Sequence, residues 1–385
     1  MAIAQRLLPL LILVCHTIHS SATVSGRVEH PKGGPMWTVG GNKYGQLGTG
    51  RHEEIDKPQK IMKQVKAVAA GEFSTFYIKG DGSAWAVGFN KHGNFGDGSQ
   101  EIRDQPVEVG SNVSHIVAGM RHTIFIQEDG TAWATGRNPV GQLGIGNKQD
   151  QMTPQKVMGD VDYAAAGAGH TIFLKKDGTA HVSGRNQFGQ FGDGTKKDHY
   201  SPKHIMSNVK AVACGNGASY FLTKDGVVHA VGHNQYGQAG DGSTKDHIKP
   251  VAVIDKIKDV NAGANHVFFL GEDGTAYGSG QNTYGQLGDG TREDKHHPVK
   301  VMEGVMAISA GFQHTLFLKE DLTVWAVGRN NMGQLGDGTQ RDKLTPVKVM
   351  EEIEAIAAGN GHSVFLEADH THKPISADIA HELEL

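Results

Sequence analysis

Glycine-rich loops that could bind phosphate or calcium recur along this sequence. One of them, VGRNNMGQLGDGT at residues 327–339, contains four glycines, two asparagines and an aspartate. A phosphate-binding loop would end in Lys-Ser or Lys-Thr and open a helix, and this stretch does neither. Asp337 and Asp342 lie five residues apart, but calcium takes six to eight oxygen ligands, which an EF-hand supplies at dense spacing. We therefore expect these aspartates to form turns or caps.

Histidine is the other residue type here that could bind a metal. Five histidines share one repeated position, namely His122, His170, His266, His314 and His362. A regular step in sequence places each of them in a separate structural unit, so they cannot converge on one ion. We expect each ring to make a structural hydrogen bond to a nearby loop carbonyl. The pair His296-His297 and the segment 370–372 also lack the ligand set of a zinc site.

No combination of residues typical of an enzyme is present in the sequence. It contains no Gly-x-Ser-x-Gly, no His-Glu-x-x-His, and no carboxylate pair outside the repeated context. The 37 Lys and Arg nearly balance the 41 Asp and Glu, for a formal charge of −4, and no basic block favours a nucleic-acid partner. We predict no catalytic residues, no bound metal and no cofactor.

The glycine-rich loops belong to a repeat of 48 residues. Glycine makes up 53 of 385 residues, about twice the usual ~7%, which favours many turns over long helices. Repeats of this length are typical of solenoids, propellers and arrays. The residues that open each WAVGxN variant are Trp37, Trp85, Trp133, His181, His229, Tyr277 and Trp325.

Each repeat has room for four short strands. In residues 154–186 the segments PQKVM, VDYAAAG, HTIFLK and TAHVSG have strand character, and Lys-Asp-Gly joins the last two. The sixth copy has Asp321-Leu322 instead of Asp-Gly, so that hairpin must bend differently or carry strain. The first and last partial repeats are complementary halves, and their pairing would leave no open sheet edge. The sequence predicts an all-β fold, a seven-bladed β-propeller over residues 36–369, closed by pairing of its N- and C-terminal strands.

The inner strand of each predicted blade is small and apolar, as in Ala67–Gly71. Blades crowd toward the axis of a propeller, so small side chains suit this strand. Cys214 takes a position that other repeats fill with alanine, and we expect a buried structural cysteine because cysteine packs as a small hydrophobe. No basic residue flanks it to activate a thiolate.

The N-terminus has the pattern of an export signal. Arg6 precedes an apolar run from Leu7 to Cys15, and Ser20 and Ala22 stand at positions −3 and −1 of a cleavage site. The run is too short to span a bilayer. We expect a signal peptide at 1–22, a linker at 23–35 and a C-terminal tail at 370–385, with no membrane insertion after cleavage. The product would be secreted or extracytoplasmic.

The repeated pattern AAGxxHTxFLxxDGTxWAxGxNxxGQLGDGTxxDxxxPVKV resembles the repeat of the regulator of chromosome condensation family, over residues 36–369. The resemblance implies a seven-bladed β-propeller closed by strands from both ends. The best-known member of that family is a nuclear exchange factor for the small GTPase Ran that also binds nucleosomes. Other members are secreted bacterial proteins such as the type II β-lactamase inhibitor protein, which caps an enzyme with one propeller face. With its export signal, this chain resembles the secreted branch more.

The chain departs from the nuclear exchange factor in three respects. It begins with an export signal, it has no basic N-terminal tail, and its uniform repeats leave no room for a long wedge between blades. Because a shared fold does not transfer activity, we do not carry exchange activity over. Two alternatives stay open: guanine-nucleotide exchange or other regulation of a small GTPase, and an enzyme that uses the central channel.

Variable positions in the loops mark a candidate binding surface. If the inner strand runs up and the next strand runs down, the loops AGxxH and GxNxxGQLGDGT emerge on one rim and the Asp-Gly turns on the other. Aromatic residues and arginine are enriched in binding hot spots. Alternatively, the aromatics pack between blades and the arginines are merely solvated. The candidate partner-binding residues are Tyr44, Phe73, Phe89, His92, Arg121, Arg137, Arg185, Phe188, Tyr236, Tyr284, Phe312, Arg329 and Met332.

One N-glycosylation sequon, Asn112-Val113-Ser114, falls on the rim of the Asp-Gly turns. A sugar on Asn112 would leave the opposite rim free. Taken together, the sequence favours a secreted, monomeric, non-enzymatic propeller that docks another protein on its loop-rich face. A rigid ring would hold the contact side chains in place, so that little entropy is lost on docking.

Overall fold

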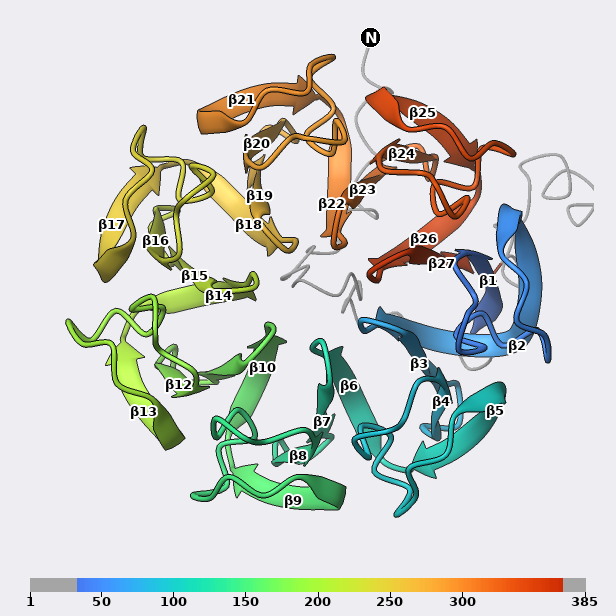
Figure 1. Ribbon diagram of the computed structural model, residues 1–385, viewed down its shortest axis with the longest axis horizontal. Coiled ribbons are helices and arrows are strands. Elements are labelled where there is room, and N and C mark those ends of the chain that lie inside the picture. Colours follow the sequence, from blue (N-terminus) through green and yellow to red (C-terminus); the bar gives the residue numbers. More distant parts are fainter. Residues whose placement is uncertain (1–32, 370–385) are drawn as a thin grey trace, which may run out of the picture.

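The computed structural model describes residues 33–369, which form a ring of seven β-sheet blades around a central axis (Figure 1). The predicted signal peptide and C-terminal tail lie outside the described residues, as does nearly all of the predicted linker. From the axis outward, the strands are β26 (Ile353–Ala358), β27 (His362–Glu367), β1 (Gly34–Gly40) and the first half of β2 (Ile55–Ala70) in blade 1; the second half of β2, β3 (Ser74–Lys79), β4 (Ala84–Gly88) and β5 (Arg103–Gly110) in blade 2; β6 (Val113–Ala118), β7 (His122–Gln127), β8 (Ala132–Gly136) and β9 (Gln151–Met158) in blade 3; β10 (Val161–Ala166), β11 (His170–Lys175), β12 (Ala180–Gly184) and β13 (His199–Met206) in blade 4; β14 (Val209–Cys214), β15 (Ala218–Thr223), β16 (Val228–Gly232) and β17 (His247–Ile254) in blade 5; β18 (Ile257–Ala262), β19 (His266–Gly271), β20 (Ala276–Gly280) and β21 (Lys295–Met302) in blade 6; and β22 (Val305–Ala310), β23 (His314–Lys319), β24 (Val324–Gly328) and β25 (Lys343–Met350) in blade 7.

Blade 1 combines the two ends of the described chain. β1 pairs antiparallel with β27, and the register places Trp37 opposite Phe365 and Gly40 opposite His362. β1 also pairs with the first half of β2, whose second half begins blade 2. The predicted all-β propeller, closed by its N- and C-terminal strands, is therefore confirmed. The described residues contain no helix, and so none that could cross a membrane.

A ring of aromatic side chains forms the core between blades. The second strand of every blade contributes at least one, and Phe173, Phe221 and Phe317 are completely buried. Each lies opposite the residue that opens the WAVGxN segment, as Phe317 does to Trp325. Large rings fill the widening space between adjacent sheets, whereas the inner strands carry alanine and glycine where the blades converge. Cys214 is buried in that inner ring, as predicted, and burial raises the pKa of its thiol.

Buried histidines connect neighbouring blades at five junctions. Nε2 of His122 lies 2.9 Å from Oγ1 of Thr171 in the next blade, and Thr171 in turn donates to the carbonyl oxygen of Gln142 at 2.7 Å. Because the hydroxyl proton is used in that bond, the imidazole must be the donor, from Nε2. The partner is a hydroxyl of the next blade rather than the expected loop carbonyl. The other pairs are His170 with Ser219, His266 with Thr315, His314 with Ser363 and His362 with Thr75.

The two remaining junctions show what replaces this hydrogen bond. Ala218 stands in the histidine position of blade 5, and the hydroxyl position that it would face holds Val267, so both polar groups are lost together. In blade 2 the shorter Ser74 stands in the histidine position. Oγ1 of Thr123 across that junction is buried and has no hydrogen-bond partner among the described residues. The histidine therefore holds adjacent blades in register by donating to a hydroxyl that would otherwise be buried without this partner.

The hairpin of the sixth repeat has the same backbone conformation as its counterparts, although it lacks the glycine. Leu322 has φ of +61°, in the left-handed region, where Gly82 and Gly274 have +80° and +79°. A side chain with a Cβ is disfavoured there by roughly 1–2 kcal/mol. Of the two outcomes expected from the sequence, this hairpin carries strain rather than bending differently.

Acid should destabilise the ring steeply below pH 6.5. Burial lowers the pKa of His122 and His362 to about 4 and of His170, His266 and His314 to about 3. In the unfolded chain these imidazole rings become protonated near pH 6.5, whereas in the folded protein they stay neutral down to about pH 4. The free energy of unfolding is therefore highest above pH 6.5 and falls as the pH drops toward 4. Each histidine contributes a slope of about 1.4 kcal/mol per pH unit, measurable by urea unfolding between pH 6.5 and 4.5.

The double variant His122→Ala/Thr171→Val copies the natural Ala218–Val267 pair and provides the control. Whatever its absolute stability, its slope should be shallower by about 1.4 kcal/mol per pH unit, since one proton fewer is taken up on unfolding. An unchanged slope would show that His122 does not contribute in this way.

Relief of strain at Leu322 should stabilise the protein. Leu322→Gly is expected to raise the free energy of unfolding by about 0.5–1 kcal/mol, because the relief exceeds the flexibility that glycine adds to the unfolded chain. Gly274→Leu is the matched reverse change, with space for a Cβ but φ of +79°, and should lower it. Urea denaturation at neutral pH measures both. A less stable Leu322→Gly variant would mean that contacts of the leucine side chain outweigh the strain.

Candidate protein-binding face

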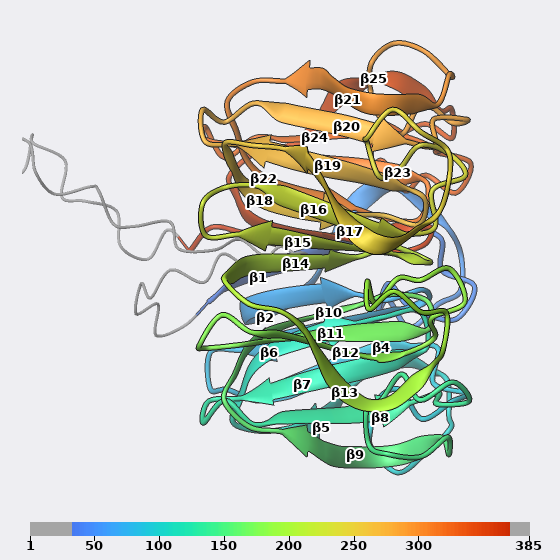
Figure 2. The same ribbon diagram turned by 90° about the vertical axis from the view of Figure 1, so that its left-hand side faces the viewer.

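The loops that follow the first and third strands of each blade gather on one face of the disc, which we call the loop-rich face (Figure 2). In blade 2 these are residues 71–73 and 89–102. The opposite face, called here the hairpin face, carries the Asp-Gly turns and the turns from each outer strand to the next inner strand. β1 begins and β27 ends on the hairpin face. The loop-rich face is therefore free of the points where the described chain enters and leaves.

A buried asparagine organises each long loop of the loop-rich face. Oδ1 of Asn330 accepts from the backbone N–H of Leu335 at 2.9 Å, and its Nδ2 donates to Oδ1 of Asp337 at 3.0 Å. Asp337 also accepts from the backbone and hydroxyl of Thr339, while Asp342 accepts from the backbone N–H of Asn330 at 2.9 Å. These aspartates are turn and capping residues, as predicted. Within residues 33–369, no group of three or more His, Cys, Asp or Glu is arranged to hold a metal ion.

The variable residues of this scaffold interlock between adjacent blades. The ring centroids of Phe188 and His233 lie 4.6 Å apart, and the guanidinium of Arg329 lies 4.8 Å from the centroid of Tyr284. Both pairs follow the same rule. Phe188 stands two positions after the loop asparagine of its blade, and His233 stands one position before the loop asparagine of the next blade. The packing between blades that the second interpretation of the sequence expected is therefore present. These side chains also remain partly exposed, and their role in binding stays a prediction.

Four of the candidate residues form an aromatic cluster on blades 1 and 2, consisting of Tyr44, Phe73, Phe89 and His92. The Tyr44 ring lies 5.1 Å from both Phe73 and Phe89, and Phe89 lies 5.8 Å from His92. The tilted and edge-on angles are the favourable geometries for aromatic pairs. All four side chains are partly exposed, so together they present an apolar surface to solvent.

Arg121 contacts the aromatic cluster and also lines a neighbouring depression. Its Nε lies 3.1 Å from Oε2 of Glu72, and its Nη1 lies 3.5 Å from Nε2 of His92. Partial burial lowers the pKa of His92, and the charges of Arg121 and Arg137 lower it further. His92 is therefore neutral at neutral pH, and the positive charge of this part of the face comes from arginine.

A depression with a volume of about 460 Å³ lies beside Arg121. It brings together five of the predicted residues, Arg121, Arg137, Arg185, Phe188 and Phe312. It also includes six that were not among the candidates. These are Met120, Ala168, Asn216, Gly217, His233 and Asn265, and we call the whole site the arginine depression. The signal for Met120 and Asn216 was present in the sequence, since the position after the inner-strand glycine holds five different residue types in the seven repeats.

The remaining candidates lie farther around the rim. Nη1 of Arg329 donates to Oε1 of Gln313 at 2.5 Å while its guanidinium covers Tyr284. Met332 packs over Gly41, where an added Cβ would come within 2.8 Å of its Sδ. Tyr236 lies 6.1 Å from His233, next to the arginine depression. All thirteen predicted residues lie on the loop-rich face, but they form separate groups rather than one continuous patch.

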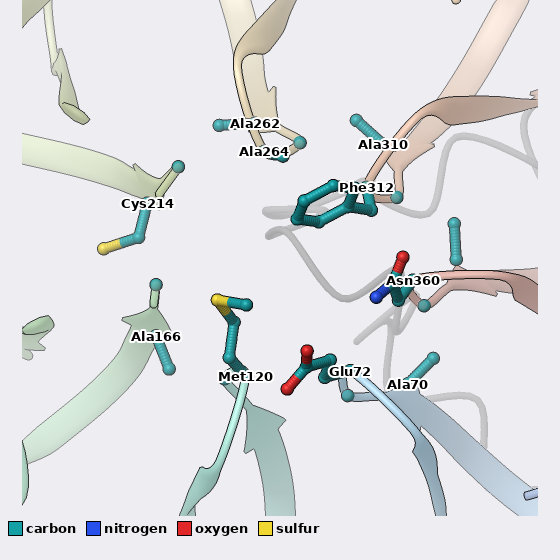
Figure 3. Close-up of a pocket in the computed structure, with 18 of the residues that line it drawn as sticks. Ala70, Glu72, Met120, Ala166, Cys214, Ala262, Ala264, Ala310, Phe312 and Asn360 are labelled. Atoms are coloured by element: carbon teal, nitrogen blue, oxygen red, sulfur yellow. The ribbon is translucent and has the colours of Figure 1, made fainter. Parts of the chain in front are cut away.

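The central channel is narrow and lined mainly by alanine, glycine and backbone (Figure 3). Its volume is about 120 Å³, and Glu72, Met120, Phe312 and Asn360 surround it (Figure 3). The described lining residues include two titratable side chains, Glu72 and Cys214. Glu72 pairs with Arg121, and the raised pKa of Cys214 keeps its thiol protonated. This lining offers no nucleophile paired with a base.

Asn112 is exposed in the turn between β5 and β6 on the hairpin face, with φ of +56°. Its position agrees with the rim expected from the sequence, and a sugar there would not cover the loop-rich face.

The geometry defines a class of protein, a closed seven-bladed propeller with a variable loop face. Comparison with family models narrows this class. The model of the RCC1-like domain matches residues 158–372, which is more than half of the chain, and the model of the regulator of chromosome condensation (RCC1) repeat matches residues 33–78, 81–126 and 129–174. The chain therefore belongs to the RCC1 repeat family. No curated protein sequence matches it significantly.

Solved structures show the same fold. Prp20p from Saccharomyces cerevisiae, described with binding properties to Gsp1p and histones, is 19% identical with a TM-score of 0.79, over 91% of this chain and 95% of that one. Human WBSCR16 is 21% identical with a TM-score of 0.78, over 87% of this chain and all of that one. At these identities the likeness establishes the fold, and the function has to be argued from the surface.

Proposed function

We propose that this protein is an exported, non-enzymatic propeller that binds another protein through its loop-rich face. The observation that carries the proposal is the division between constant and variable positions. Asparagine, glycine and the inter-blade hydrogen bonds recur around the ring, where they build the blades. The positions that differ from blade to blade, such as Tyr44, Arg137 and Phe188, are exposed or partly exposed on one face.

The composition of this face supports protein binding. Aromatic side chains and arginines dominate the variable positions, and these residue types carry much of the energy of protein interfaces. Their interlocking between blades holds them in fixed positions before any partner arrives, which reduces the entropy lost on binding. The binding of Gsp1p and histones by Prp20p shows that a propeller of this fold can serve protein recognition.

Replacement of Phe188, Tyr236 and Tyr284 by alanine should abolish capture of the partner. The experiment uses the mature propeller immobilised through a C-terminal tag, because β27 ends on the hairpin face. We expect binding of the captured protein to weaken at least about tenfold, or ~1.4 kcal/mol. Stability should fall by no more than about 1 kcal/mol per residue, since the three rings are only partly buried, Phe188 and Tyr284 each lose one inter-blade contact, and Tyr236 loses its contact with His233 in the same loop. Titration calorimetry and thermal unfolding measure the two effects.

Trp85→Ala provides the control. Trp85 is a partly buried aromatic residue near the hairpin-face end of β4, stacked on Tyr77 with ring centroids 6.3 Å apart. Its replacement should lower stability and leave binding unchanged. Equal loss of binding in the control and the triple variant would reject the loop-rich face as the binding surface, and a large loss of stability in the triple variant would make its residues packing residues.

Export is tested separately in cells with a secretory pathway. The full-length chain should appear in the medium with its N-terminus at Thr23, because cleavage is expected after Ala22. A variant without residues 2–22 should remain inside the cell. N-terminal sequencing and localisation of the tagged chain provide the measurement, and a full-length product in the nucleus or cytosol would instead favour an intracellular regulator.

A further inference from the structure

The arginine depression concentrates positive charge in a protein whose formal net charge is −4. Arg121 and Arg137 come from blade 3 and Arg185 from blade 4, so adjacent blades place three guanidinium groups around one hollow. None of the described lining residues is an aspartate or a glutamate. The charge of this hollow is therefore not neutralised from within.

Two of the three arginines have no partner in the described part of the chain. Arg121 is paired with Glu72 at 3.1 Å, whereas Arg137 and Arg185 make no ion pair there and no side-chain hydrogen bond. Arg137 is exposed, and Arg185 is half-buried against Gly169. An arginine held at the edge of a hollow without a partner retains all five of its donors for a bound group.

The rest of the depression supplies an apolar wall and one oriented donor. Phe188, Phe312 and Met120 contribute apolar surface. Nδ1 of His233 lies 2.9 Å from Nε2 of Gln238, so it accepts from that amide, and the neutral ring carries its proton on Nε2. A lining that combines guanidinium and imidazole donors with aromatic rings suits a group that has both a carboxylate and an apolar part.

The geometry points to an acidic segment of a partner protein as the occupant of the arginine depression, with Asp or Glu side chains beside an apolar residue. This inference rests on the proposed function and specifies the chemistry of the partner. Arg137 and Arg185 bind the carboxylates, since guanidinium matches a carboxylate in two-point contact. Phe188 and Phe312 receive the apolar neighbour.

A nucleic acid fits this face less well than an acidic protein segment. Its backbone needs a positive track along many phosphates, whereas Glu72 and Asp150 flank the arginines and the chain as a whole is acidic. The volume of about 460 Å³ has the size of a site for a few side chains.

A phage-displayed library of random peptides, selected on the tagged mature propeller, tests the inference. We expect enrichment of peptides with Asp or Glu next to an aromatic or aliphatic residue. Their synthetic versions should bind the double variant Arg137→Gln/Arg185→Gln about tenfold more weakly, and less tightly at high salt. Arg292→Gln is the matched control, because Arg292 lies in a long loop of the same face, outside the arginine depression, where its Nη1 donates to the carbonyl oxygen of Thr283 at 2.9 Å and its Nη2 lies 3.6 Å from Asp342. Binding to it should be unchanged.

Three results would overturn the inference. They are selection of peptides without carboxylates, equal binding to the parent and the double variant, and binding of a double-stranded DNA oligonucleotide that is tighter than that of the peptides and lost in the double variant. The first two leave the proposed function intact, provided that the Phe188, Tyr236 and Tyr284 replacements still abolish capture of the natural partner. Loss of that effect alone would reject the proposed function instead.

Discussion

The ring depends on one non-covalent junction, the pairing of β1 with β27. Six blades are each built from a continuous stretch of chain, and only blade 1 joins segments separated by more than 300 residues. Side chains reinforce this junction, since Nε1 of Trp37 donates to Glu367 at 2.7 Å and Nζ of Lys60 lies 3.4 Å from the same carboxylate. Without it, two sheet edges would open and the loop-rich face would lose its fixed spacing.

Repetition separates what builds the ring from what the ring displays. The buried loop asparagines recur in every blade and the histidine–hydroxyl pairs at five junctions, because they build the blades and join them to their neighbours. The fold does not require one particular residue at the positions of Phe188 and Arg185, and the residue found there differs among the blades. The interlocking of variable residues across junctions combines the two roles, because the same contacts that order a side chain also present it to solvent.

Most of the fold was predictable from the sequence, and the site only in part. The 48-residue period and the Asp-Gly turns are local patterns that predict the strands of each blade. The complementary half-repeats predict how the two ends of the propeller pair to close the ring. The histidine partner was assigned to a loop carbonyl, since a hydroxyl 49 residues away becomes a neighbour only when blades pack. The positive φ of Asn112 and Lys256, in the turns between blades, could not be predicted from the sequence either. Among the repeats, only Gly304 is a glycine at that position. The strand directions correctly placed the thirteen candidate residues together on one rim, but their grouping into an aromatic cluster and an arginine depression depends on side-chain geometry.

The central claim is that one face of the disc binds the partner. Hydrogen–deuterium exchange of the propeller with and without its captured partner tests this claim most directly, because backbone amides report on every blade at once. The account predicts protection in the loops that contain Arg121, Arg137 and Phe188, with unchanged exchange in the Asp-Gly turns. Protection confined to the hairpin face or to the outer strands β9 and β13 would contradict it.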